Sequence, residues 1–266
     1  MATLSSDLRI DIDRLSDRLA ALAEIGAIEG TEGCARLALT DEDKAGRDLV
    51  VSWMRDLDLT ITVDSIGNVV GVMDGEHDGQ PVMTGSHIDT VRTGGRYDGN
   101  LGVLAGLEVI ETLRSAGITP PRGLAVAFFT DEEGARFPPD MLGSLVYVGG
   151  MSVEEAHAIE GIDGATVGGE LDRIGYLGPA PLPAPAPHAF VELHVEQGPV
   201  LEAEELTIGA VTGVQGISWT EVSVTGQSNH AGTTPRALRK DPAVVAFRPA
   251  AFVRELADEL GAPQVA

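Results

Sequence analysis

Apolar residues recur at helical spacing in several segments of the chain. Residues 7–25 carry such a pattern with charged residues between its members, which are Leu8, Ile12, Leu15, Leu19, Leu22 and Ile25. This spacing predicts a surface helix. Further helices are predicted over 41–57, 100–116, 153–160 and 243–260. Ser152 and Glu155 have the spacing of a capping box for the helix over 153–160, and Gly117 would end the helix over 100–116.

Short apolar runs between the predicted helices indicate strands. They cover 59–64, 66–73, 81–86, 124–130, 189–195, 206–212 and 217–226. The run 124–130 has no polar alternation, as is typical of a strand inside a parallel sheet. The repeated prolines of 178–188 predict an extended connector instead. Alternating strands and helices predict an α/β fold with a mixed, mainly parallel sheet flanked by helices.

The composition excludes several classes of function. The formal net charge of −23 over 266 residues disfavours nucleic acid and anionic membranes as partners. No run approaches the roughly 18 apolar residues that span a bilayer, and the N-terminus lacks a signal-type apolar stretch. Cys34 is the single cysteine, which is consistent with a cytoplasmic location. The acidity has two open interpretations, a salt-adapted proteome and an ordinary acidic protein from a GC-rich genome.

Residues of the types that bind metals lie at the carboxyl ends of several predicted strands. They are His87 and Asp89 in GSHIDT, Glu132 and Glu133 in FTDEEG, and His194 in ELHVEQG, with Asp98 in a glycine-flanked turn before the helix 100–116. Ligands of parallel sheets bind beyond the carboxyl ends of the strands. Imidazoles and carboxylates bind divalent cations such as zinc, and a spare glutamate beside the metal is the usual general base. The pattern therefore predicts a metal-dependent hydrolase.

Each residue also has a simpler interpretation when it is taken alone. Asp98 could cap the helix 100–116, and His194 could be a buried histidine with a backbone partner. Glu132 and Glu133 could form a solvated acidic loop. Asp89 lies two residues after His87, so on an extended segment both side chains face the same way. The order of the segments decides between these interpretations.

That order resembles the amidase family of N-carbamoyl-L-amino-acid hydrolases, β-ureidopropionases and allantoate amidohydrolases, within the di-zinc peptidase superfamily. The matching strings run from about residue 85 to 241 and are GSHIDTVRTGGRYDGNLGVLAGLEV, FTDEEGARFPPDMLGS, ELHVEQGPVLE and GVQGISWTEVSVTGQSNHAGTTPRALRKD. Histidine at position 194 and the GQSNHAGTTP loop favour the carbamoylase branch over the peptidases.

The resemblance implies two divalent metal ions. One ion would be held by His87, Asp98 and His194, and the second by Asp98 as a bridge and by Glu133. Zinc is the expected metal, and manganese, cobalt and nickel also suit such ligands.

The resemblance also implies roles for four further residues. Glu132 would be the general base and Asp89 would orient His87. Gln197 would contact the substrate. His230 would enter the active site of a neighbouring subunit in a homodimer.

The same resemblance implies that family members are longer than this chain. We expect a catalytic domain over 1–212, without its last part and the histidine that completes the second metal site, and a partial lid and dimerisation domain over 213–266. The expected reaction is hydrolysis of the C–N bond of a small molecule, an N-carbamoyl-L-amino acid, β-ureidopropionate or allantoate. The alternatives are a peptidase or aminoacylase of the same superfamily, or an inactive truncated remnant.

Overall fold

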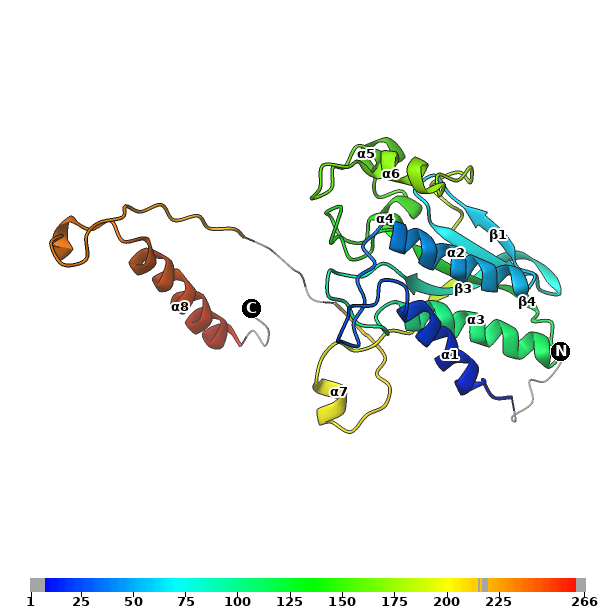
Figure 1. Cartoon of the computed structure of the whole chain (residues 1–266). Helices are drawn as coiled ribbons and strands as arrows, with labels where there is room; N and C mark the ends of the chain where they lie inside the picture. The colour runs from blue at the N-terminus through cyan, green and yellow to red at the C-terminus, as the bar shows by residue number, and fades with distance from the viewer. Residues whose placement is uncertain (1–7, 215, 217–219, 262–266) are drawn as a thin grey trace. The chain divides into compact units, whose positions relative to one another are not determined.

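The computed structural model describes residues 8–214, 216 and 220–261. The chain divides into two units, Met1–Glu204 and Glu205–Ala266, so the domain boundary expected after residue 212 lies inside the second unit. The first unit contains the sheet (Figure 1). It also contains each candidate site residue named above except His230.

The helices of the first unit are α1 (Ile12–Ala23), α2 (Asp41–Asp56), α3 (Asn100–Ser115), α4 (Leu142–Tyr147), α5 (Val153–His157), α6 (Val167–Ile174) and α7 (Val200–Ala203). Its strands are β1 (Thr60–Val63), β2 (Val69–Met73), β3 (His77–His87), β4 (Arg122–Phe129) and β5 (Ala189–Val191). The second unit contains the short 3-10 helix η1 (Arg236–Leu238) and the helix α8 (Pro242–Leu260).

The strands form one mixed sheet in the order β1-β2-β4-β3-β5. β3 pairs in parallel with β4 and β5, while β1 with β2 and β2 with β4 are antiparallel. The predicted α/β fold with a mixed sheet flanked by helices is confirmed, and its parallel part is limited to β4, β3 and β5. In the register of this part His87 lies opposite Phe129, so the chain leaves β3 and β4 at the same edge.

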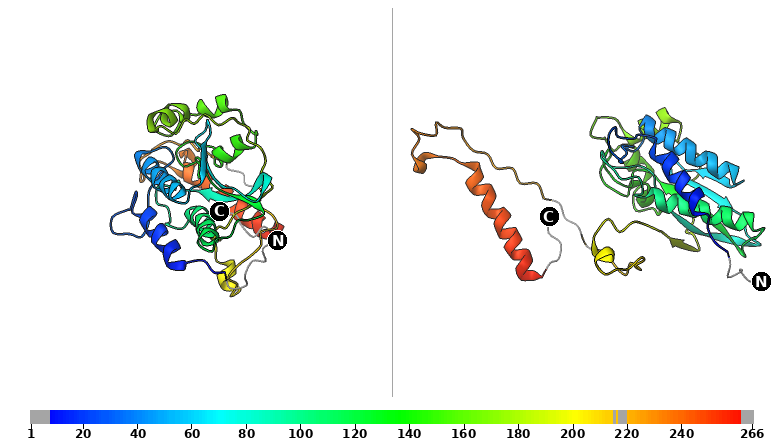
Figure 2. Two further views of the ribbon diagram at one scale, coloured as in Figure 1. Left: turned by 90° about the vertical axis from the view of Figure 1, so that its right-hand side faces the viewer. Right: turned by 60° about the horizontal axis from the view of Figure 1, so that its bottom comes forward.

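Helices cover the sheet unequally. α1, α2 and α3 lie along one face, where the larger apolar core forms (Figures 1 and 2). Fully buried members of this core come from each layer and include Leu22, Met54, Leu107 and Phe128. The smaller cluster on the other face centres on Met83, Ala127 and Phe129, with Tyr147 of α4 packed against it. Burial of the first face holds β3, β4 and α3 together.

Local sequence explains where the main helices begin. The Thr40 hydroxyl accepts a hydrogen bond from the backbone of Asp43, which caps α2. The predicted capping box of Ser152 and Glu155 is present at the start of α5. The helices expected over 41–57, 100–116 and 243–260 are confirmed to within one residue at each end. α1 starts at Ile12, later than expected, because Asp11 caps it there.

Two predicted strands are wrong in the described part of the chain. Residues 206–212 and 220–226 contain no strand, and 217–219 of the second prediction lie outside the described residues. The expected strand 189–195 is limited to β5, and the short helices α4, α6 and α7 were not predicted. A strand needs a neighbouring strand for its backbone groups, and the described residues supply none for these apolar runs.

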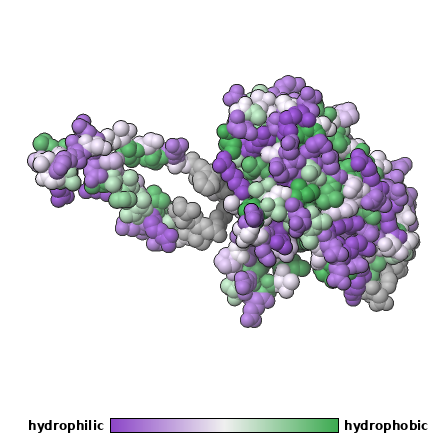
Figure 3. Space-filling model, viewed as in Figure 1, coloured by the Kyte–Doolittle hydropathy of each residue, from purple (hydrophilic) through white to green (hydrophobic). Residues whose placement is uncertain are grey.

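The surface of the first unit is largely polar on the side shown. Figure 3 shows hydrophilic residues over much of the viewed face of this unit. Among the described residues, no helix has the length and the apolar character that crossing a membrane requires.

Candidate metal centre

His87 is the last residue of β3, and only 1% of it is exposed. Its Nδ1 lies 2.9 Å from the carbonyl oxygen of Asp89. When Nδ1–H donates to this carbonyl, Nε2 is left free to bind a metal. The ring packs against the backbone of Gly99, where an added Cβ would lie 2.4 Å from Nε2. Gly99 also has a φ of 62°, so it combines the close approach with a turn that favours glycine.

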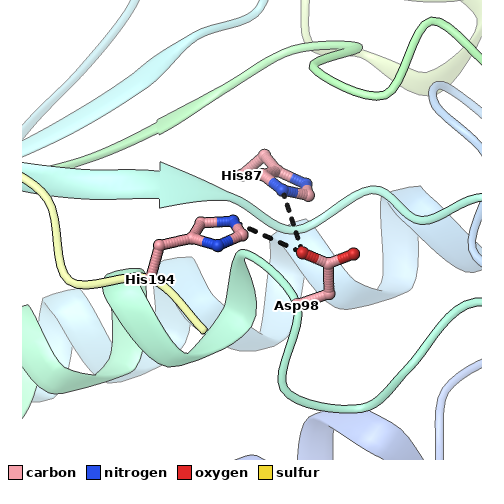
Figure 4. Close-up of side chains that lie close together, drawn as sticks. All are labelled: His87, Asp98 and His194. Carbon is pink, nitrogen blue, oxygen red and sulfur yellow. Dashed lines mark ion pairs between the residues drawn. The ribbon is translucent and has the colours of Figure 1, made fainter. Parts of the chain in front are cut away.

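Asp98 and His194 complete a group of three side chains (Figure 4). Asp98 Oδ1 lies 3.3 Å from Nε2 of His194 and 3.9 Å from Nε2 of His87. One ligand atom from each residue lies within 4.8 Å of the other two. Ligands of a tetrahedral site with bonds of about 2.1 Å are about 3.4 Å apart, so these distances fit a divalent cation after small movements.

The simpler interpretation of Asp98 does not agree with the structure. The N-cap residue of α3 is Gly99, and no side chain makes a capping hydrogen bond there. The Asp98 carboxylate instead faces the two histidines and accepts a hydrogen bond from Gln197 Nε2 at 2.7 Å. Gln197 therefore lies at the edge of the centre, which is compatible with the substrate contact expected of it.

Asp89 connects the two loops that leave β3 and β4. Its carboxylate oxygens accept hydrogen bonds from the backbone N–H groups of Glu132 and Glu133, each at 3.3 Å. The same carboxylate lies 3.9 Å from Nδ1 of His87, too far for a hydrogen bond. Asp89 thus contacts the His87 ring through its carbonyl oxygen, while its carboxylate fixes the loop that carries the two glutamates.

Glu132 and Glu133 diverge from this loop. Oε2 of Glu132 lies 3.4 Å from Nε2 of His87, and the Glu132 side chain is 36% exposed. Oε1 of Glu133 is buried and has no hydrogen-bond partner among the described residues. Burial raises the pKa of both carboxyls, that of Glu133 to about 7. A buried carboxylate oxygen without a partner is the kind of group that a cation would satisfy.

The charges of the centre also favour a cation. Burial lowers the pKa of His87, but the nearby carboxylates, chiefly Asp89 and Glu132, outweigh burial and raise it above its usual value. Burial also raises the pKa of Asp89. Several carboxylates within one pocket repel one another, and a divalent cation would remove that repulsion. The residues present therefore fit a metal ion.

His230 lies in the second unit. Its Nδ1 accepts hydrogen bonds from the backbone of Gly232 at 3.1 Å and Thr233 at 3.2 Å, in an exposed turn. This turn fixes the ring and leaves Nε2 without a partner among the hydrogen bonds of the described residues. The expected role of His230 in a neighbouring subunit stays a prediction.

Two buried ionisable residues beside the centre were not singled out from the sequence. Arg36 and Asp131 are both fully buried. Arg36 interrupts the apolar run Cys-Ala-Arg-Leu-Ala-Leu, and a charged residue in such a run is the signal that could have identified it. Asp131 directly precedes the two glutamates, and such a run of acids is typical of a solvated loop. Nothing in the sequence therefore indicates that Asp131 is buried.

Comparisons with known proteins agree with this geometry. A family model described as peptidase family M20/M25/M40 matches residues 83–264. The N-carbamoyl-L-amino-acid amidohydrolase of Rhizobium meliloti is 42% identical over 261 residues, which cover 97% of this chain and 62% of that protein. The ureidoglycolate hydrolase of Arabidopsis thaliana is 34% identical over 253 residues, which cover 91% of this chain and 53% of that protein.

A solved structure is similar over the same span. The crystal structure of a hydantoinase/carbamoylase family amidase from Burkholderia ambifaria has a TM-score of 0.81 and 43% identity, covering 97% of this chain and 63% of that one. The chain therefore spans between 53% and 63% of the length of these three proteins.

Proposed function

Because the chain belongs to the peptidase family M20/M25/M40, we propose that it forms the metal-binding part of an amidohydrolase that cleaves the C–N bond of N-carbamoyl-L-amino acids. One observation carries the proposal. His87, Asp98 and His194 converge on one point, and Glu132 lies 3.4 Å from Nε2 of His87. The similarity to the Rhizobium meliloti enzyme supports this substrate class, and the similarity to ureidoglycolate hydrolase supports a ureido acid more generally.

A first divalent ion, with zinc as the expected metal, would be held by His87, Asp98 and His194. A second ion would share Asp98 and add Glu133, whose buried Oε1 has no hydrogen-bond partner in the described part of the chain. When bound, these ions supply Lewis acidity at the substrate carbonyl. Manganese, cobalt and nickel also suit this mixed set of nitrogen and oxygen ligands.

Glu132 is the proposed general base. Its carboxylate is half-buried, so it reaches the centre and still meets water. It takes a proton from the attacking water and later gives that proton to the leaving nitrogen. One water then converts an N-carbamoyl amino acid into the free amino acid, ammonia and carbon dioxide. Asp89 holds the Glu132 loop in place through its bonds to the backbone.

The remaining proposed roles concern the substrate and a partner subunit. Gln197, which donates to Asp98 here, would contact the substrate. His230 of a second copy would stabilise the developing oxyanion in a homodimer, as a preorganised donor does. Residues 213–266 would then belong to a lid and dimerisation domain. The single cysteine and the acidic composition are consistent with a cytoplasmic protein.

A chimera with the full length of a relative tests this proposal. Residues 1–266 would replace the matched part of the Rhizobium meliloti enzyme, and release of ammonia from N-carbamoyl-L-methionine would be measured in zinc and in manganese. We expect turnover of the N-carbamoyl substrate and little hydrolysis of N-acetyl-L-methionine or of a dipeptide. Preference for the acetyl or peptide substrate would instead assign the chain to an aminoacylase or peptidase.

The Glu132→Gln variant of the same chimera tests the role of the general base. We expect it to lose at least about a hundredfold in kcat, within the range of general-base contributions, while it retains its bound metal. Loss of metal together with activity would show that Glu132 is a ligand and that its role has been exchanged with that of Glu133.

A further inference from the structure

Arg36 lies between α1 and α2 with its whole side chain buried. Among the described residues, its guanidinium makes no ion pair within 4.0 Å. Each of its hydrogen bonds goes to a neutral oxygen. Nη1 donates to the carbonyl oxygens of Leu22 at 3.0 Å and Ile25 at 2.8 Å, which fixes the end of α1. A buried charge without a paired carboxylate is costly, so the hydrogen bonds of the Arg36 guanidinium have to compensate for the lost water.

Those bonds reach the two loops that carry the metal-binding side chains. Nε donates at 2.8 Å to the carbonyl oxygen of Ile88, the residue directly after His87. Nη2 donates at 3.0 Å to Oδ1 of Asn100, which lies two residues after Asp98. One planar guanidinium therefore joins the backbone beside His87 to a side chain beside Asp98.

Asn100 passes this connection to the Asp98 turn. It is fully buried, and its Nδ2 donates at 3.1 Å to the carbonyl oxygen of Arg96. The bond closes the turn between residues 96 and 100, which contains Asp98. The amide oxygen of Asn100 thus binds Arg36 while its amide nitrogen binds the turn that contains Asp98.

The backbone of Arg36 adds a second connection to the His87 loop. Its N–H donates to Oγ1 of Thr90 at 2.8 Å, and its carbonyl oxygen accepts from the N–H of Thr90 at 2.9 Å. Thr90 follows Asp89 directly, so the loop is held on both sides of Asp89. Burial lowers the pKa of Arg36, and the buried side chains of Cys34, Asp43 and Asp89 oppose that lowering.

From these contacts we infer that Arg36 is a positioning residue for the metal centre, setting the separation of His87 and Asp98 that a divalent ion requires. This inference rests on the proposed metal site, since Arg36 itself touches neither the ion nor the substrate. A guanidinium can bridge Ile88 and Asn100 at once because its donors point in fixed directions. A lysine keeps the charge but has a single nitrogen, so it cannot make both bonds in the same geometry.

The test compares Arg36→Lys with Arg14→Lys in the full 266-residue chain. Arg14 lies in α1, and its guanidinium hydrogen-bonds the buried Glu108 of α3 at 2.7 and 2.8 Å, away from the loops of the centre. The readouts are the thermal midpoint of the metal-free protein and the affinity for Co²⁺, measured by absorption and calorimetry. We expect both variants to melt lower. Only Arg36→Lys should bind Co²⁺ more weakly, by about tenfold, the lower end of the effects of groups that support metal ligands.

The Asn100→Ala variant provides a second measurement. It should weaken Co²⁺ binding as Arg36→Lys does, and the double variant should lose little more, because the two changes break one bridge. If Arg36→Lys does not fold, Asn100→Ala alone decides the question. Unchanged Co²⁺ affinity in Arg36→Lys or Asn100→Ala would overturn the inference. Failure of the unaltered chain to bind Co²⁺ would instead refute the proposed metal site.

Discussion

Asp131 is fully buried in a left-handed backbone conformation, with a φ of 55°. Neither of its carboxylate oxygens has a hydrogen-bond partner among the described residues. Burial, together with the nearby Asp89 charge, raises the pKa of Asp131 to about 9. At neutral pH its carboxyl is therefore uncharged in the metal-free protein, and this explains how an acid is tolerated there.

The raised pKa values predict how stability changes with pH. Glu133 titrates near 7 and Asp131 near 9 in the folded chain, against ordinary values of 4.5 and 3.8. Between about pH 4 and 9 the folded chain holds protons that the unfolded chain has released, so the free energy of unfolding falls as the pH rises. We expect the thermal midpoint in EDTA to be higher at pH 5 than at pH 8.

The Asp131→Asn variant is the control for this pH dependence. An amide resembles the neutral carboxyl in shape and carries no charge, so the variant should fold and show a shallower decline between pH 5 and 8. A midpoint that stays constant or rises with pH in the metal-free chain would contradict the assigned cause.

At the scale of residues, the candidate ligands were easier to predict than the contacts around them. The family resemblance implied His87, Asp98 and His194 as one ligand group, and the structure brings their ligand atoms within 4.8 Å. The positions of these residues at strand ends and before a helix indicated only that they would lie at one edge of the sheet. The contacts of Arg36 and the burial of Asp131 depend on segments far apart in the chain, and no local pattern contains them.

Elements were predictable where local signals and tertiary contacts agree. α2 and α3 have apolar residues at helical spacing, and their bounds match the prediction to within one residue. The apolar runs 206–212 and 217–226 have the composition of strands, but whether a run pairs depends on a neighbour that its own sequence does not specify. The short helices α4, α6 and α7 span too few turns to show a period.

α3 packs closely on the sheet through Gly106. A Cβ added at Gly106 would lie 2.7 Å from the Thr84 side chain of β3 and 3.0 Å from that of Val126 in β4. Gly106→Ala should lower the thermal midpoint, although alanine favours helices by about 1 kcal/mol over glycine. The matched control is Gly169→Ala in α6, where the new methyl would meet only the Thr166 hydroxyl. Equal or higher stability of Gly106→Ala would contradict this close packing.

For the whole molecule, the net charge of −23 is the dominant feature. Hydrophilic residues extend over much of the face of the first unit shown in Figure 3. Carboxylates repel one another at low ionic strength, and salt screens that repulsion. We expect a higher thermal midpoint in molar potassium chloride than in low salt, as a salt-adapted protein would show. An unchanged midpoint would favour an ordinary acidic protein from a GC-rich genome.

The central claim is that His87, Asp98 and His194 hold a divalent ion. Titration of the metal-free 266-residue chain with Zn²⁺ in a calorimeter tests it most directly, with His87→Ala and His194→Ala beside His188→Ala, an exposed histidine outside the centre. We predict one tightly bound ion per chain and a much weaker second one, because Asp98 and Glu133 alone would hold the latter.

His87→Ala and His194→Ala should lose more than about a hundredfold in affinity, since removing a ligand weakens a site more than removing its support. His188→Ala should bind as the unaltered chain does. Tight binding that survives His87→Ala and His194→Ala, or no binding by the unaltered chain, would contradict the account.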